Sequence, residues 1–84
     1  MEARSAIQSD NYKDAAGFYA KALDAAPWWA KGYYNHALIL SQLKCYKEAA
    51  TEMKRYLSLS PDAPGAKKAQ EKMYEWDYEA KKQQ

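Results

Sequence analysis

The chain has 84 residues, 48% of them hydrophobic and 29% charged, which is the composition of one small soluble domain. A net charge of +2 does not favour nucleic acid as a partner, because nucleic-acid-binding surfaces are strongly basic. One cysteine and one histidine exclude an internal disulfide and the usual metal clusters, and no signal peptide or stretch of ~20 apolar residues is recognisable. These features leave the localisation open.

The first two predicted helices cover about residues 1–9 and 12–26. In the second, Ala15, Tyr19 and Leu23 recur at helical spacing, and the run ends before Pro27, which cannot continue a helix interior. Asn11 precedes this run and is a good N-cap residue, so we expect a helix to begin there.

The next two predicted helices cover about residues 29–43 and 46–59. Their apolar faces are formed by Tyr33, Ala37, Leu40 and Leu43, and by Ala49, Met53, Tyr56 and Leu57. Cys45 occupies the N-cap position of the second of these helices, where cysteine is a poor residue.

A last helix is predicted over about residues 63–81, with Asp62 as its N-cap and Pro64 in its first turn. Its apolar face is formed by Ala66, Ala69, Met73, Trp76 and Ala80. No strand pattern is present, and the connections are short, so we expect an all-α fold with neighbouring helices antiparallel.

The sequence contains an internal repeat with a period of 34 residues. Residues 11–27 (NYKDAAGFYAKALDAAP) match residues 45–61 (CYKEAATEMKRYLSLSP) at this single offset. The paired positions include Tyr12 and Tyr46, Lys13 and Lys47, Ala15 and Ala49, Ala16 and Ala50, Leu23 and Leu57, and Pro27 and Pro61. Such a repeat indicates stacked helical hairpins.

The repeat resembles the tetratricopeptide-repeat (TPR) family, whose 34-residue pattern is W-x2-L-G-x2-Y, then A-x3-F, then P. The corresponding residues here are Tyr33, His36, Ala37, Leu40, Ala49, Met53 and Pro61. The spacing agrees, whereas several letters depart from the pattern. The resemblance implies antiparallel helix–turn–helix repeats stacked as a right-handed superhelix of about five helices.

On this resemblance, residues 1–84 form a single TPR domain. Residues 1–27 would be a partial first repeat, residues 28–61 a full second repeat, and residues 62–82 a C-terminal capping helix. Because TPR stability usually requires about three repeats, we expect the chain to be the C-terminal part of a longer array.

The resemblance also implies a protein-interaction module, whose concave groove is lined by the first helix of each pair. The groove positions carried over are Lys31, Tyr34, Asn35, Leu38, Ser41 and Gln42 from the full repeat, Arg4, Ile7 and Gln8 from the partial repeat, and Lys68, Lys72 and Trp76 from the last helix. This basic and aromatic set suits a protein or peptide partner with acidic character. The carboxylate-clamp set of one TPR subgroup is incomplete, since Arg4 replaces an asparagine and Gly65 a lysine.

The alternative function is structural self-association within a larger TPR array, mediated by stacking or by the aromatic residues near the C-terminus. Oligomers that become monomers on substitution of Trp28, Trp29 or Trp76 would favour it. An enzyme is not expected, because no nucleophile–base pair, glycine-rich phosphate loop or cofactor motif is visible. We therefore predict no catalytic residue, no cofactor and no metal. Stacking of single-stranded RNA on aromatic residues is a distant third alternative.

Four features allow a structural or a functional interpretation. His36 is expected to be a hydrogen-bonded core residue, and a pH switch is the alternative. Cys45 is either a tolerated loop substitution or a reactive thiol. At least one of Trp28 and Trp29 is expected to pack between helices. The aromatic residues in positions 74–78 cannot share one helix face, so at least one of them should be exposed.

Overall fold

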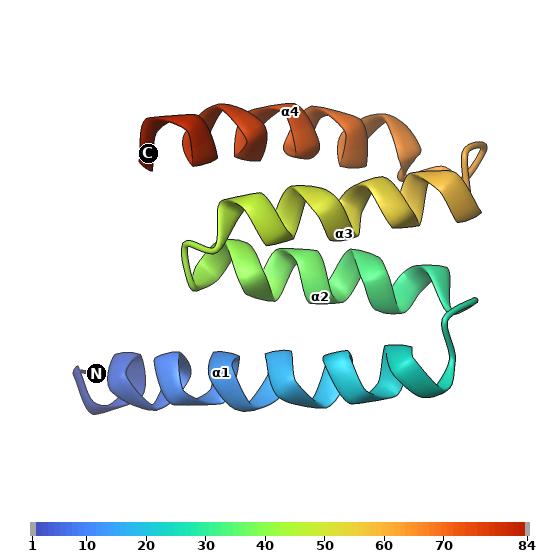
Figure 1. Cartoon of the computed structure of the whole chain (residues 1–84). Coiled ribbons are helices and arrows are strands. Elements are labelled where there is room, and N and C mark those ends of the chain that lie inside the picture. The colour runs from blue at the N-terminus through green and yellow to red at the C-terminus, as the bar shows by residue number, and fades with distance from the viewer. Residues whose placement is uncertain (1, 84) are drawn as a thin grey trace.

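The computed structural model describes the backbone of residues 2–83 and the side chains of residues 11–83. The backbone forms no strand in this range and four helices, α1 (Glu2–Ala25), α2 (Ala30–Gln42), α3 (Tyr46–Leu59) and α4 (Ala66–Gln83). Each helix runs antiparallel to the preceding one, and the four lie side by side in chain order (Figure 1). The predicted all-α fold is therefore confirmed.

The structure has one helix where the sequence predicted two, over residues 1–9 and 12–26. Asn11 lies inside α1 and is not an N-cap. The stretch before Gly17 contains no proline or glycine, and an asparagine in a helix interior costs only up to about 0.7 kcal/mol. That cost does not outweigh the backbone hydrogen bonds of a continuous helix, so within residues 2–83 there are four helices and not five.

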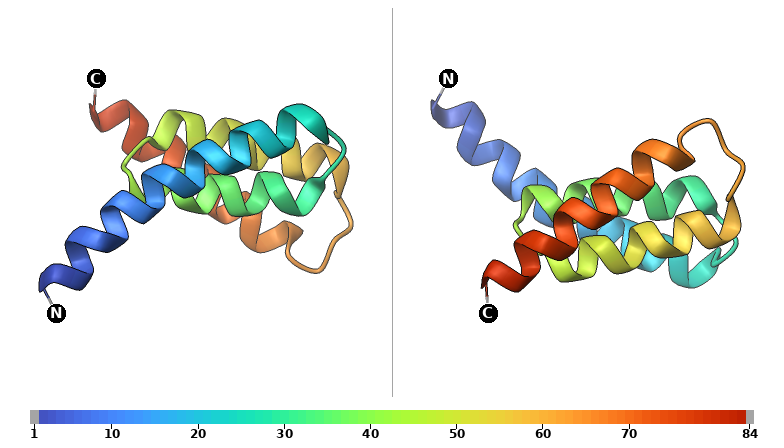
Figure 2. Two further views of the ribbon diagram at one scale, coloured as in Figure 1. Left: turned by 90° about the horizontal axis from the view of Figure 1, so that it is seen from below. Right: turned by 90° about the horizontal axis from the view of Figure 1, so that it is seen from above.

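α1 and α4 are the two outer helices, and the N-terminal half of α1 extends past the ends of the other three (Figures 1 and 2). The remainder of α1 packs on α2, and its half-buried and buried side chains include Ala16, Tyr19 and Leu23. Although α1 has 24 residues, neither it nor any other helix within residues 2–83 is apolar enough over a sufficient length to cross a membrane.

The limits of the other helices differ from the prediction mainly at α4. α3 occupies the predicted range, and α2 is shorter by one residue at each end. α4 begins at Ala66, after a loop in which Ala66 N–H donates to the Ala63 carbonyl. Asp62 is thus not its N-cap, and Pro64 lies in the loop. A residue that precedes proline is disfavoured in helical conformation, so the sequence before Pro64 delays the start of the helix.

The core is formed largely by the predicted apolar faces of the helices, whereas several predicted residues are only half-buried, among them Leu43, Leu57, Ala66 and Ala80. The buried apolar residues are Leu23, Tyr33, Ala37, Leu40, Ala49, Ala50, Met53, Tyr56, Ala69, Met73 and Trp76. Ala37, Ala49 and Ala69 are fully buried, one each in α2, α3 and α4. Small side chains at these contacts allow the helix backbones to approach closely.

The turn between α2 and α3 is a Schellman motif, a hydrogen-bonded helix end that requires one residue with left-handed backbone. Cys45 N–H donates to the Leu40 carbonyl at 2.9 Å, and Lys44 N–H donates to the Ser41 carbonyl at 3.0 Å. Lys44 has φ 62°, a value at which glycine is normally found. Cys45 is the N-cap of α3, as predicted, and makes no side-chain capping hydrogen bond.

Candidate functional site

The exposed face of α2 between α3 and α4 carries most of the predicted binding residues. Lys31, Tyr34, Leu38 and Gln42 follow one another at steps of three and four residues, and Asn35 is next to Tyr34, so the five share one side of the helix. Lys31 and Gln42 are exposed, whereas the other three are half-buried. Two surface hollows lie along this side, and together we name them the α2–α4 groove.

The first hollow lies beside the α3–α4 loop and has a volume of about 480 Å³. Its walls include Lys31, Tyr34 and Asn35 from α2, Tyr56 from α3, and Ala63, Pro64 and Gly65 from the loop. The rings of Tyr34 and Tyr56 meet edge to face, with 5.0 Å between their centroids. This loop-side hollow therefore combines apolar walls with one lysine and one amide.

Asn35 provides a side-chain amide to the wall of the loop-side hollow. Its side chain is half-buried, and within residues 11–83 no hydrogen bond of its amide is found. A side-chain amide offers both donors and an acceptor, which matches the two hydrogen-bonding groups of a peptide unit.

The second hollow lies beside the α2–α3 turn and has a volume of about 350 Å³. Its walls include Leu38, Ser41 and Gln42 from α2, Lys44 and Tyr46 from the turn and α3, and Lys72, Glu75 and Trp76 from α4. Ser41 Oγ is engaged, because it donates to the Leu38 carbonyl at 2.7 Å. This turn-side hollow is more polar and carries charges of both signs.

The structure brings six of the nine predicted partner-binding residues to these two hollows. Lys31, Tyr34 and Asn35 line the first, and Leu38, Gln42 and Lys72 line the second. Lys68 is exposed on α4 and lines neither hollow. The side chains of Arg4 and Gln8, and also of Ile7, lie outside the described residues. Their backbone continues α1 and does not fold back beside α2, contrary to the predicted separate helix (Figure 2).

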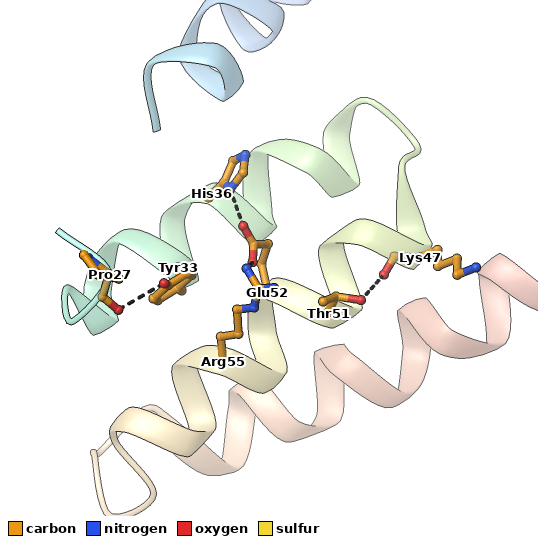
Figure 3. A network of polar contacts seen from close by, with 7 residues as sticks. All are labelled: Pro27, Tyr33, His36, Lys47, Thr51, Glu52 and Arg55. Atoms are coloured by element: carbon orange, nitrogen blue, oxygen red, sulfur yellow. Dashed lines mark hydrogen bonds and ion pairs between the residues drawn. The ribbon is translucent and has the colours of Figure 1, made fainter. Parts of the chain in front are cut away.

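A buried polar network lies on the opposite side of α2, where it faces α3 (Figure 3). His36 Nδ1 donates to Glu52 Oε1 at 2.8 Å, and Arg55 Nη1 donates to Glu52 Oε2 at 3.2 Å. His36 and Glu52 are only 8% and 9% exposed. The prediction of a hydrogen-bonded core histidine is confirmed.

Glu52 was not identified from the sequence, although a signal for it existed. It occupies the core-facing side of α3, between Ala49 and Tyr56, where the spacing predicts an apolar residue. A carboxylate at such a position needs a buried partner, and His36 is the only histidine in the chain.

The structure shows which of the tryptophan pair and of the C-terminal aromatic residues are packed and which are exposed. Trp29 packs, because its ring stacks on Tyr19 at 5.8 Å between centroids, whereas Trp28 is 72% exposed. Trp76 is buried, while Tyr74 and Tyr78 are exposed. The predictions that one tryptophan of the pair packs and that at least one C-terminal aromatic residue is exposed are both confirmed.

Cys45 is half-buried, and its Sγ lies 3.8 Å from the Leu43 carbonyl oxygen. Within residues 2–83 no group of three or more His, Cys, Asp or Glu residues is arranged to hold a metal ion.

Comparison with family models, with curated proteins and with solved structures gives no match for this chain. The functional assignment therefore depends on the residues and on the geometry of the α2–α4 groove.

Proposed function

We propose that the chain is a protein-interaction module of the TPR type, and that the α2–α4 groove binds a peptide or an extended segment of a partner protein. The observation that supports this proposal best is the gathering of six predicted residues around two hollows along the same side of α2: Lys31, Tyr34, Asn35, Leu38, Gln42 and Lys72. The resemblance to the TPR family assigns these positions to the concave side of a TPR superhelix.

The loop-side hollow suits an apolar side chain of the partner. Its volume of about 480 Å³ is within the range of small-molecule sites, and the walls that Tyr34, Tyr56 and Pro64 form are apolar. Burial of a large apolar side chain contributes roughly 1.5–3 kcal/mol. Asn35 lies at the same hollow, where it can hold the peptide backbone beside this anchor.

The charges around the groove favour acidic residues next to that anchor. Lys31 borders the loop-side hollow, Lys44 and Lys72 border the turn-side hollow, and Lys68 is exposed on the same helix as Lys72. Glu75 is the acidic residue among the walls of the groove. Lysines attract carboxylates without fixed geometry, so they favour a charge pattern more than a single sequence.

The experiment that tests the proposal is selection from a random-peptide display library with the purified chain as bait. We expect selected peptides to share one large apolar residue with acidic neighbours. Tyr34→Ala and Lys31→Glu should each weaken their binding about tenfold, equivalent to about 1.4 kcal/mol. Isothermal titration calorimetry on synthetic peptides would measure this change.

The matched controls are Tyr74→Ala and Lys67→Glu, since both residues are exposed on α4 and line neither hollow. Circular dichroism would confirm that all four variants keep their helical content. Selected peptides whose affinity is the same for the groove variants and the controls would contradict the proposal.

A further inference from the structure

The outward face of α1 is an exposed surface that the α2–α4 groove does not use. Asp14, Gly17, Phe18, Lys21 and Ala25 are all exposed and lie within one arc of the helix, because successive residues are rotated by about 100°. The opposite arc of α1 packs on α2. α1 is one of the two outer helices of the row, and among the four helices it packs mainly on α2 (Figure 1).

Two residues at the centre of this face are unfavourable in an isolated chain. Phe18 is 66% exposed, although a phenylalanine is normally buried. Gly17 lies in the interior of α1, where glycine is less favourable than alanine. A Cβ at Gly17 would meet nothing within 4 Å, so packing within the chain does not require a glycine there. A close neighbour outside the chain would explain both residues.

The charges on the outward face are complementary to those of a second copy of the same face that runs antiparallel to it. Asp14 lies three residues before Gly17, and Lys21 lies three residues after Phe18. The two charged residues are therefore equally far from the midpoint between Gly17 and Phe18. If two copies of α1 lie antiparallel about a two-fold axis through this midpoint, Asp14 of each copy is opposite Lys21 of the other. Phe18 of each copy then lies over Gly17 of the other, where the missing side chain leaves room for the ring.

We propose that the outward face of α1 binds a second copy of this chain, as an antiparallel α1–α1 pair. A two-fold interface requires a surface that is its own complement, and the order Asp14, Gly17, Phe18, Lys21 has this property. A parallel pair would place Asp14 against Asp14 and Lys21 against Lys21, which like-charge repulsion disfavours.

The antiparallel arrangement also determines where the N-terminal half of α1 lies in the pair. The N-terminal half of each α1 extends past its own bundle (Figure 2). In the pair, residues 10–13 run beside residues 22–25 of the other α1, and residues 2–9 continue past its C-terminal end, toward the loop that carries the exposed Trp28. The α2–α4 groove lies on the other side of α2, so the pairing leaves both grooves open and presents two of them in one assembly.

The test is sedimentation velocity over a wide range of protein concentration on the full chain and four variants. We expect the unchanged chain to dimerise, and Asp14→Lys and Lys21→Glu each to raise the dimer dissociation constant about tenfold or more, because each creates two like-charge pairs. The double variant Asp14→Lys/Lys21→Glu exchanges the charges and should restore the affinity. The control Lys67→Glu, exposed on α4, should leave the affinity unchanged.

A chain that stays monomeric at every concentration would overturn the proposal, and so would a dimer that the single variants leave unchanged. Failure of the double variant to restore the affinity would overturn the antiparallel register. Gly17→Leu gives a second test, because a Cβ at this position meets nothing within 4 Å in its own chain, whereas the leucine would fill the space for Phe18 of the second copy. It should keep its helical circular dichroism and lose the dimer; a persistent dimer would contradict the model of pairing.

Discussion

Glu52 is a carboxylate in the core, and its position is tolerated because both of its oxygens accept hydrogen bonds. One bond comes from His36 at 2.8 Å and the other from Arg55 at 3.2 Å. The two donors differ in exposure, since the His36 side chain is 10% exposed and the Arg55 side chain 59%. Arg55 can exchange its bond for water, whereas His36 cannot.

Replacement of Glu52 by alanine should therefore destabilise the fold by about 1–3 kcal/mol, the cost of a buried polar group without a partner. Glu52→Gln should lose less, because its amide oxygen still accepts the bond from His36. Urea unfolding followed by circular dichroism would measure both changes.

The matched control for Glu52 is Glu71→Ala, an exposed glutamate on α4, which should change the free energy of unfolding by less than about 0.5 kcal/mol. If Glu52→Ala and Glu71→Ala had equal effects, the His36–Glu52 contact would contribute nothing to stability.

At the scale of the helix and its turns, Lys44 is the residue whose conformation conflicts most clearly with its type. Its left-handed backbone completes the Schellman motif that ends α2 and positions Cys45 at the start of α3. For a residue with a Cβ, this conformation costs roughly 1–2 kcal/mol. The motif uses only backbone groups of Lys44, so it does not depend on the lysine side chain.

We expect Lys44→Gly to raise the free energy of unfolding by about 1 kcal/mol, because glycine adopts the left-handed conformation without this cost. Lys54→Gly, at an exposed position inside α3, should lower it by about 1 kcal/mol. Thermal unfolding of the two variants would show shifts of opposite sign, and a loss of stability in Lys44→Gly would contradict the explanation.

The helices that could be predicted from the sequence are those whose apolar spacing and ends agree. The limits of α2 and α3 are predicted nearly to the residue, because each has an apolar face at helical spacing and α3 ends shortly before Pro61. The start of α1 was wrong, since the preference of Asn11 for an N-cap is weaker than the gain from continuing a helix. The predicted start of α4 at residue 63 was wrong, because a proline such as Pro64 is compatible both with the first turn of a helix and with the loop before it.

The candidate groove was predictable only in part. Lys31, Tyr34, Asn35, Leu38 and Gln42 share a face because helix geometry requires it, and that much follows from spacing. The other walls depend on how α3 and the loop of residues 60–65 pack. The sequence therefore did not predict that Tyr56 and Pro64 line the groove, or that the ring of Tyr34 contacts that of Tyr56. Lys72 reaches the groove and Lys68 does not, a distinction of one helical turn that requires the position of α4.

At the scale of the whole molecule, α4 covers a side of α3 that would otherwise be exposed. Its buried residues are Ala69, Met73 and Trp76, and Trp76 is only 4% exposed. In a chain of 84 residues such a residue contributes a large share of the core.

Trp76→Ala should cost about 3–5 kcal/mol, which is comparable to the whole stability of many small domains. Trp28→Ala removes the same side chain from a position that is 72% exposed, and it should cost less than about 0.5 kcal/mol in the monomer. Urea unfolding at low protein concentration would compare them, and equal losses would show that the burial of Trp76 is not what stabilises the molecule.

The order of the helices in space also affects how quickly the chain can reach this structure. Each helix packs mainly on its neighbours in the sequence, so most contacts join segments separated by a single short turn. The entropy lost on closing such short loops is small, and proteins dominated by local contacts fold in microseconds to milliseconds. The α2–α3 hairpin can form first, and α1 and α4 can then be added independently from either side.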